Sequence, residues 1–466
     1  MDTAPSSAPT TGTSVARALP EPRGLVVPPA LALGAAGLGA VGVVAVWFAG
    51  LSTAPGPWHA VGRLSGLLAA YLMVVLVYLV ARVPALERGA GADRLTRWHT
   101  VVGKTVIALV AVHVLTLAAG RGHGGGRGGG PFGRGGGQGL RQAGSGAVEA
   151  PHELGTLAVV AIVVLGVVSV LLARRVVRYS TWHGFHLLGY AVVVLVFAHL
   201  VTTGRDVAQR PAVLVVWGLV LGAGVVTLVV NRAVRPLVLD RRHRLRVSRV
   251  VEEAPGVTSV YVTGERLDRW RAASGQFFRW RFLAPGLRWS ANPYSLSAPP
   301  TTAGLRLTAA QVGDHSGRLP TLRPGTRVLL EGPSGAITPR ALTSPHVVLM
   351  ASGTGITPVR ALAESLGRAG RDVTVVYRAR DRQQAVLADE LERLAVDLPV
   401  RVHLLLGRRT DPACALTPAR LLAVAPRIAQ SDVFVCGSAA FTAAARQAAR
   451  DAGTPPQRVH TELFSW

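Results

Sequence analysis

The sequence contains little cysteine and almost no lysine, and each shortage excludes a class of protein. The two cysteines, Cys414 and Cys436, are too few for a disulfide framework or a multi-cysteine metal site. Lys104 is the only lysine, so the formal net charge of +25 comes almost entirely from arginine. The arginines are dispersed, without the helical stripe or interleaved aromatics of a nucleic-acid platform. We therefore expect no nucleic-acid partner.

Charged residues are missing from long stretches of the first half. The 466 residues are 49% hydrophobic with a mean hydropathy of +0.36, which is too high for a purely soluble protein of ordinary charge. Uncharged runs near or beyond the roughly 18 residues that indicate a bilayer span occur six times. They cover residues 30–51, 64–81, 105–119 (reaching back towards 98), 154–173, 181–203 and 212–230. We therefore predict an α-helical membrane bundle of six spans within residues 27–235, in contact with lipid.

The segment before the first run is different in composition. Residues 1–26 are rich in Ala, Pro, Ser and Thr, and we expect them to be disordered. The first run is too long for a removable signal peptide and lacks its cleavage pattern. We therefore count this run as a membrane span.

The arginines indicate which way the spans run. Six spans place both ends of the membrane domain on one side. Arginines gather between the second and third runs, between the fourth and fifth, and after the sixth: Arg82, Arg88, Arg94, Arg97, Arg174, Arg175, Arg178, Arg232 and Arg235. By the positive-inside rule these positions mark the cytoplasmic face of a multi-pass protein in the cell membrane. The bias is modest, because residues 120–146, a Gly-rich segment that we expect to be a flexible outer loop, hold further arginines.

Histidines also lie in or beside the spans, where a buried ionisable group indicates function. They are His59, His99, His113, His183, His186 and His199. His99 and His113 are 14 residues apart, about 21 Å along one helix, and His186 and His199 are 13 apart, about 19 to 20 Å along another. Because both helices run the same way, His99 matches the depth of His186, and His113 that of His199. Two bis-imidazole sites across the bilayer follow, and b-type haem is the cofactor that uses such sites.

The second histidine pair needs a local change in its helix. Thirteen residues rotate an ideal helix by about 140°, so His186 and His199 share a stripe only if the helix deforms, for which Gly189 offers a place. His183 is an alternative ligand to His186. A hydrogen-bonded interior role is the competing interpretation for each histidine, and we favour it only for His59, which has no partner at its depth. Arg63 could pair with a haem propionate, although snorkelling to the interface explains it equally well.

The second half begins with short apolar stretches between Pro and Gly turns. Over residues 241–342 they predict a small antiparallel β-barrel. Within it stands the run Asn292-Pro293-Tyr294-Ser295-Leu296-Ser297. This run resembles the flavin-binding signature of the ferredoxin–NADP reductase superfamily. The resemblance implies that Tyr294 flanks the isoalloxazine of FAD, that the Ser295 hydroxyl lies near flavin N5, and that Leu296 and Ser297 also contact the flavin.

One position of this signature departs from the family, and a second segment extends the resemblance. The family usually has Arg or His where this chain has Asn292, and a nearby arginine could supply the charge: Arg279, Arg281 or Arg288. Residues 311–319, Gln-Val-Gly-Asp-His-Ser-Gly-Arg-Leu, are similar to the segment that holds the flavin pyrophosphate. Gly313, Ser316 and Arg318 are the candidates there, although such a stretch alone indicates only a hairpin turn. Residues 331–335 resemble the turn that closes the flavin domain.

Residues 343–466 alternate strand and helix, which predicts a parallel sheet. Residues 347–358 give a strand, a glycine turn and the start of a helix. In that turn, Gly353, Thr354 and Gly355 allow the backbone to approach a pyrophosphate at the helix N-terminus. With Thr357 and Pro358 opening the helix, the run closely matches the superfamily's nicotinamide-nucleotide motif.

Two later strands carry further candidates. Arg378 and Arg380 follow the strand at 373–377, placed to meet a ribose 2′-phosphate, and a solvated charge cluster is the alternative. Cys436 and Gly437 stand where the family has Cys-Gly-Pro beside the nicotinamide, with Ser438 in place of proline. A buried structural cysteine is the competing interpretation.

The C-terminus completes the candidate site. In this superfamily a C-terminal aromatic stacks on the flavin, and Phe464 or Trp466 would serve. Glu462 lies just before them, and we take Cys436, Ser295 and Glu462 as the candidate catalytic residues.

The combination, over residues 30–466, resembles the ferric reductase/NADPH oxidase superfamily. It implies that electrons pass from cytoplasmic NAD(P)H through FAD and two b haems to an acceptor outside the cell. A ferric chelate is our first choice of acceptor. The alternatives are dioxygen, giving superoxide, or an external partner enzyme fed by this cytochrome subunit. A non-catalytic haem sensor is disfavoured by the complete flavin–nucleotide half. Neither the choice between NADH and NADPH nor the oligomeric state follows from the sequence.

Overall fold

A computed structural model describes residue 18 and residues 25–54, 56–124, 150–173, 179–335, 337–408 and 411–463. The chain divides into two compact units, one of residues 26–233 and one that begins at Val234. Most of the Gly-rich segment, the arginines at 174, 175 and 178, and the predicted flavin-stacking aromatics Phe464 and Trp466 lie outside the described residues.

The first unit is entirely helical in its described part. Its helices are α1 (Pro29–Ala49), α2 (Pro57–Val80), α3 (Pro84–Ala90), α4 (Ala92–Gly124), α5 (Ala150–Ala173), α6 (Tyr179–Leu187), α7 (Gly189–Thr203), α8 (Arg205–Ala208) and α9 (Pro211–Val229). Among the described residues, five spans are long and apolar enough to cross a membrane, with α6 and α7 sharing one of them. In α5 the described apolar stretch is the shorter Thr156–Ser169, so a sixth span stays a prediction.

The surface of these helices fits a lipid environment. Large apolar side chains point outwards on several helices, and Leu38, Leu115, Val194 and Leu219 are each at least 67% exposed. Such a surface would be costly in water and is the expected one in hydrocarbon.

Small residues let two of the helices approach closely. At Gly62 on α2 a β-carbon would lie 2.8 Å from Leu117 of α4, and at Gly66 it would lie 2.7 Å from the ring of His113. Glycine at these positions therefore brings the α2 backbone against α4 and leaves room for a histidine ring between them.

A break interrupts the helix that carries His186 and His199. α6 ends at Leu187 and α7 begins at Gly189, with the Leu188 amide bonded to the Phe185 carbonyl at 3.0 Å, one residue short of helical spacing. The helix is therefore deformed at Leu188, directly before Gly189, and a shared stripe for His186 and His199 stays a prediction.

A π-helical turn (Val230–Val234) follows α9 and leads to α10 (Arg235–His243), the first helix of the second unit. Two three-stranded antiparallel sheets come next, in the orders β1-β2-β5 and β4-β3-β6. The strands are β1 (Arg246–Ala254), β2 (Val257–Thr263), β3 (Phe277–Phe282), β4 (Asn292–Ser295), β5 (Leu305–Ala310) and β6 (Val328–Ser334).

Both antiparallel sheets contribute to one hydrophobic core. β3 shows why: its alternate residues Phe278, Trp280 and Phe282 are fully buried, while the arginines between them face away from the core. Isolated bridges, Leu296 to Leu307 and Arg246 to Arg327, link the sheets at their edges. The predicted antiparallel flavin domain is confirmed as a fold class, and its closure into a barrel stays a prediction.

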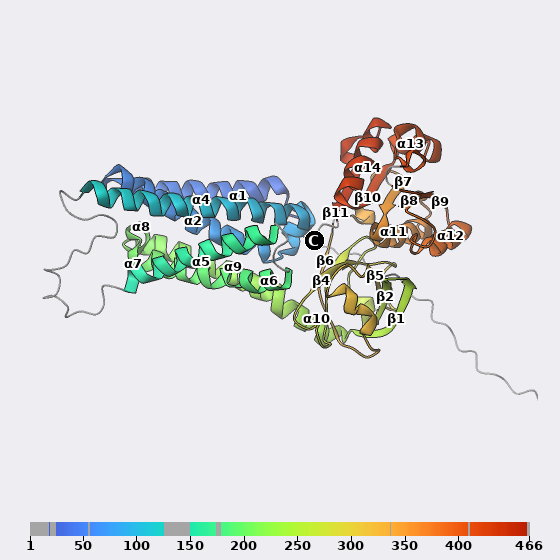
Figure 1. The fold of residues 1–466 in the computed structure, drawn as a ribbon, viewed down its shortest axis with the longest axis horizontal. Helices are drawn as coiled ribbons and strands as arrows, with labels where there is room; N and C mark the ends of the chain where they lie inside the picture. Colours follow the sequence, from blue (N-terminus) through green and yellow to red (C-terminus); the bar gives the residue numbers. More distant parts are fainter. Residues whose placement is uncertain are drawn as a thin grey trace, which may run out of the picture. The chain divides into compact units, whose positions relative to one another are not determined.

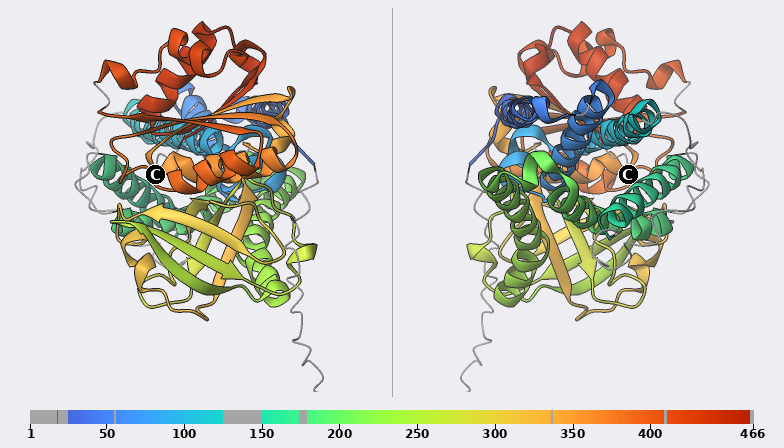
Figure 2. Two further views of the ribbon diagram at one scale, coloured as in Figure 1. Left: turned by 90° about the vertical axis from the view of Figure 1, so that its right-hand side faces the viewer. Right: turned by 90° about the vertical axis from the view of Figure 1, so that its left-hand side faces the viewer.

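The rest of the unit is a five-stranded parallel sheet in the order β11-β10-β7-β8-β9. Its strands are β7 (His346–Ser352), β8 (Asp372–Ala379), β9 (Val400–Leu406), β10 (Asp432–Gly437) and β11 (Val459–Leu463). Helices α11 (Ile356–Arg368) and α12 (Ala388–Asp397) cover one face, and α13 (Pro418–Val424) and α14 (Ala439–Asp451) the other (Figures 1 and 2). In this order β8 lies on one side of β7 and β10 on the other, so the strand order reverses at β7. The carboxyl ends of β7 and β10 therefore form the crevice where such sheets bind ligands.

Candidate functional site

The glycine turn lies at this crevice, between β7 and α11. Gly353 has φ +57°, a left-handed conformation that favours glycine, and a β-carbon there would meet open space. At Gly355 a β-carbon would collide with the carbonyl oxygen of Cys436 in β10. The first glycine therefore shapes a backbone cradle that is open above, and the second lets β10 approach the turn.

The first turn of α11 is built for an anion. The buried Thr357 hydroxyl donates to the Thr354 carbonyl at 2.9 Å and so fixes the turn. Pro358 is the third residue of α11, within the first turn, where a backbone N–H has no partner inside the helix, so its missing N–H costs no helical hydrogen bond. The remaining free N–H groups and the helix dipole favour a phosphate here.

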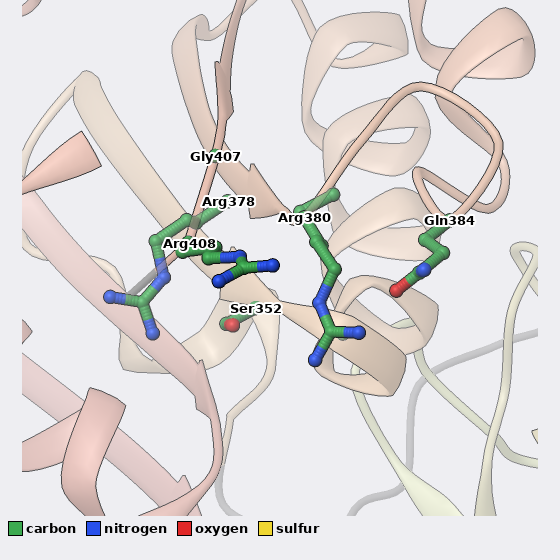
Figure 3. Close-up of a pocket in the computed structure, with 8 residues that line it drawn as sticks. Ser352, Arg378, Arg380, Gln384, Gly407 and Arg408 are labelled. Carbon is green, nitrogen blue, oxygen red and sulfur yellow. The ribbon is translucent and has the colours of Figure 1, made fainter. Parts of the chain in front are cut away.

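A cavity of about 540 Å³ opens beside this turn. It is lined by Ser352, Gly353, Arg378, Ala379, Arg380, Gln384, Gly407 and Arg408 (Figure 3). The described lining thus carries three guanidinium groups and no carboxylate, which suits an anionic ligand. The guanidinium carbon of Arg378 lies 4.8 Å from the centre of the Phe441 ring.

Sequence reasoning identified two of these arginines and missed the third. Arg408 follows β9, the neighbour of β8, so parallel pairing brings it to the same edge as Arg378 and Arg380. The signal that could have found it is the Gly407-Arg408 pair directly after a strand.

The flavin signature lies on β4, where Tyr294 is held at both ends. Its carbonyl accepts from Trp280 Nε1 at 3.0 Å, and its hydroxyl is 3.0 Å from Nδ1 of His315. Burial raises the pKa of Tyr294 and lowers the pKa of His315 to about 4. At neutral pH the phenol is therefore protonated and donates to a neutral imidazole. His315 lies in the second flavin segment, but sequence reasoning did not single it out.

The neighbouring serine has an unused hydroxyl. Ser295 is 3% exposed, and its Oγ has no hydrogen-bond partner among the described residues. An orphaned buried hydroxyl is costly unless a ligand satisfies it, so Ser295 fits the flavin contact that the resemblance implies.

The next two residues of the signature point into the domain. Leu296 is fully buried in the core, and the Ser297 hydroxyl accepts from Arg306 Nε at 3.0 Å and from Thr308 Oγ1 at 2.7 Å. The amides of Leu296 and Ser297 also donate to the carbonyls of Gln276 and Arg306. The expectation that these two residues contact the flavin is therefore corrected: they support the signature from inside the domain.

The second flavin segment is a turn stabilised by its own serine. Ser316 Oγ accepts from the amides of Val312 and Gly313 at 3.0 and 3.1 Å. No atom lies within 4 Å of where a β-carbon on Gly313 would be. Arg318 packs against Gly286, whose φ is +76°. The predicted pyrophosphate segment is therefore sterically open at Gly313, while Ser316 takes up the Gly313 amide and shapes the loop.

Two of the three candidate catalytic residues are neighbours, and one of them approaches the flavin domain. In the parallel sheet Cys436, fully buried, pairs with Glu462. In the flavin domain Ser295 pairs with Phe277. Gly335 lies between the two groups, because a β-carbon there would be 3.2 Å from Glu462 Oε1 and 3.4 Å from Phe277. The Glu462 carboxylate of the parallel-sheet domain thus lies near Gly335 and the start of β3 in the flavin domain, and β3 is the strand that pairs with β4.

In the helical unit, one predicted histidine pair is in contact. The ring centres of His99 on α4 and His186 on α6 are 5.9 Å apart at an interplanar angle of 74°. Two imidazoles that bind one metal from opposite sides, each through a bond of about 2 Å, have centres roughly 6 Å apart. Both Nδ1 atoms are buried without a hydrogen-bond partner among the described residues. The pair therefore fits two ligands of one haem iron.

Comparison with known families identifies both halves of the chain. Residues 65–197 match the family model of the ferric reductase like transmembrane component, and residues 349–447 match that of the oxidoreductase NAD-binding domain. The chain joins a ferric reductase-like membrane domain to a ferredoxin–NADP reductase-like oxidoreductase domain. The predicted superfamily is confirmed.

The relatives of the oxidoreductase domain are named as reductases or flavohaem proteins. The ferredoxin reductase component of 3-ketosteroid-9-alpha-monooxygenase from Mycolicibacterium smegmatis is 33% identical over 47% of this chain and 65% of its own. A flavohemoprotein from Deinococcus radiodurans is 28% identical over 47% of this chain and 58% of its own. The chain thus spans 58 to 65% of the length of these two relatives. A solved ferredoxin NADP+ reductase from Neisseria gonorrhoeae aligns over 47% of this chain and 98% of its own, at 18% identity and a TM-score of 0.40.

Within the ferric reductase-like domain, the second histidine pair has partners of its own. His113 Nδ1 donates to the Gly62 carbonyl at 2.7 Å, which leaves Nε2 to act as an acceptor or ligand. His199 Nδ1 and Nε2 lie 3.2 and 3.3 Å from Thr203 Oγ1. The haem role of this pair stays a prediction.

Arg63 has a protein partner, which neither of its two expected roles included. It forms a two-pronged ion pair with Asp206, which is 5% exposed, and its remaining N–H groups donate to Gly50 and Thr53. The chain itself therefore neutralises Arg63, so neither a haem propionate nor snorkelling is needed. His59 packs against Gly120, as an interior residue would.

Proposed function

We propose that the protein takes electrons from cytoplasmic NAD(P)H and moves them through FAD and two b haems to an acceptor outside the cell. The observation that carries this proposal is the pairing of His99 with His186 in a chain whose other half holds Cys436 beside Glu462, with Glu462 close to the flavin domain at Gly335. The first arrangement suits haem ligation, and the second suits hydride transfer between a nicotinamide and a flavin.

The residues of the oxidoreductase domain have separate tasks. The turn at Gly353 and the N-terminus of α11 bind the nucleotide pyrophosphate, and the arginines of the cavity bind its other phosphate. Tyr294 and the orphaned Ser295 hydroxyl orient the flavin. Buried Cys436 closes the site beside the nicotinamide and excludes water.

The histidines hold the haems, His99 with His186 and His113 with His199. When bound, FAD would accept a hydride from the nicotinamide and the haems would carry its electrons singly to the far side. The chain's part is to ligate, orient and insulate these groups.

Ferric iron in a chelate is our proposed acceptor. The relatives that are reductase components of an oxygenase favour a second candidate, an external protein acceptor. Membranes supplied with NADPH distinguish the candidates when Fe(III) chelate, dioxygen or no small acceptor is offered. Rapid turnover with the chelate alone is expected. Haem that stays reduced with both small acceptors would favour a partner enzyme.

Sealed vesicles test the direction of electron flow. In inverted vesicles, added NADPH should reduce the haems promptly. In right-side-out vesicles it should not, while an impermeant ferric chelate outside should reoxidise haem that internal nucleotide has reduced. Cys436→Ala should slow flavin reduction and leave reoxidation of chemically reduced haem unchanged. Prompt haem reduction by external NADPH in intact right-side-out vesicles would refute the proposed topology.

A further inference from the structure

A largely buried carboxylate joins the flavin-binding part of the second unit to its nucleotide-binding part. Glu390 on α12 accepts two parallel bonds from Arg306 on β5, NH1 to Oε1 at 2.7 Å and NH2 to Oε2 at 3.0 Å. Arg360 on α11 forms an ion pair with the same carboxylate, Nε to Oε2 at 2.7 Å. The side chains of Arg306, Glu390 and Arg360 are 7%, 18% and 11% exposed, so water screens these charges little.

Each arginine leads directly to a part of the proposed site. Arg306 NH2 donates to the Ser297 carbonyl at 2.6 Å, and its Nε donates to the Ser297 hydroxyl, so it fixes the end of the Tyr294–Ser297 signature. Arg360 lies on α11, the helix that begins at the glycine turn. Glu390 therefore connects the flavin signature to the nucleotide turn through only one side chain on each side.

The Glu390 carboxylate is ionised and neutralises the two arginines beside it. Burial alone would raise the pKa of Glu390, but its hydrogen bonds with Arg306 and the charge of Arg360 outweigh burial and lower it. Arg360 has a second carboxylate, Glu364, as a partner. For Arg306, Glu390 is the carboxylate that the described structure provides. A neutral residue at 390 would leave the buried Arg306 charge facing Arg360 across the boundary between the two parts.

We propose that Glu390 is a positioning residue that sets how the nicotinamide meets the flavin, by fixing α11 against the strand end that carries the flavin signature. This inference rests on the proposed function. It predicts a defect in hydride transfer with little effect on the binding of either cofactor, because Glu390 does not line the cavity beside Gly353 and its carboxylate is taken up by Arg306 and Arg360. Small displacements of reacting groups can cost about 10²-fold in rate.

Stopped-flow reduction of the flavin in the full-length protein tests this. With saturating NADPH, Glu390→Gln should reduce the flavin about tenfold to a hundredfold more slowly than the native chain. Flavin content and the KM for NADPH should stay within about twofold, and the isotope effect with nicotinamide deuterated at the transferred position should rise towards its full value. Glu390→Asp keeps the charge on a side chain that is one methylene shorter. Its rate of flavin reduction should lie between those of the native chain and Glu390→Gln.

Glu392→Gln is the matched control. It removes the same charge from the same helix, but Glu392 is 49% exposed and pairs with the surface residue Arg382. It should reduce its flavin at the native rate. If Glu390→Gln fails to fold, Glu390→Asp and its isotope effect carry the test.

The outcomes separate this inference from the function beneath it. A native protein whose flavin neither nucleotide reduces refutes the proposed function and this inference with it. Native reduction together with unchanged rates in both Glu390 variants refutes the inference alone. Loss of flavin, or a raised KM at an unchanged rate, would also overturn it, because Glu390 would then serve folding or binding.

Discussion

Arginines of the cavity beside Gly353 should determine the choice between NADPH and NADH. The described lining holds Arg378, Arg380 and Arg408, and Arg378 is partly occupied by its stacking over Phe441. A hydrogen bond between charged groups contributes about 1.5 to 3 kcal/mol. Each tenfold change costs about 1.4 kcal/mol, so Arg380→Ala or Arg408→Ala should lower kcat/KM for NADPH by roughly 10- to 150-fold. The value for NADH, which lacks the 2′-phosphate, should change by less than about threefold.

The assay is steady-state kcat/KM for both nucleotides, with Arg382→Ala as control. This substitution removes the same charge from the same loop, but Arg382 lies outside the cavity and pairs with Asp389 and Glu392. The control should behave as the native protein. Equal kcat/KM for NADH and NADPH in the native protein would show that these arginines are only solvated charges. If Arg382→Ala and Arg380→Ala lower kcat/KM for NADPH equally, the effect comes from the net charge of the protein and not from a contact between Arg380 and the nucleotide.

Two further predictions concern the cofactor sites. The intact protein should carry two haem b by pyridine haemochrome assay, and His113→Ala or His199→Ala should leave one; a count of one or none in the native protein contradicts the two pairs. In the unfolded chain His315 binds a proton below its ordinary pKa of 6.5, whereas burial in the folded protein lowers this pKa to about 4. Between these two values the unfolded state binds more protons, so the free energy of unfolding should fall by up to about 3 kcal/mol as the pH is lowered from 6.5 to 4. His315→Asn keeps an acceptor for Tyr294 without titrating, so its thermal midpoint should fall less than the native one between pH 7 and 4; parallel curves would contradict the lowered pKa.

Patterns that act over a few residues allowed much of the fold to be predicted. Uncharged runs predicted the described membrane helices because the bilayer requires length and apolarity at once. The turn at Gly353 was predictable because a left-handed φ and a close strand both demand glycine. The break before Gly189 followed from helix geometry and the spacing of two histidines.

Partners distant in the sequence could not be predicted in this way. Asp206 lies 143 residues from Arg63, and Glu390 lies 84 residues from Arg306. Neither carboxylate belongs to a motif, and only the packing of helices or domains brings each to its arginine. The sequence also does not reveal which way a side chain points at the end of a short strand. For this reason Leu296 and Ser297 were expected at the flavin, whereas their side chains lie in the interior.

The two serines of the flavin signature show what distinguishes a site from a scaffold. Both are buried, and both belong to one short run of sequence. The Ser297 hydroxyl is satisfied by Arg306 and Thr308, whereas the Ser295 hydroxyl has no partner among the described residues. A protein gains nothing from burying an unsatisfied hydroxyl unless another molecule completes it, since the cost is about 1 to 3 kcal/mol. The unsatisfied Ser295 hydroxyl is therefore our candidate for the flavin contact. The satisfied Ser297 hydroxyl bonds to Arg306, and Arg306 in turn bonds to Glu390. This chain of contacts connects the flavin signature to α11, the nucleotide-binding helix.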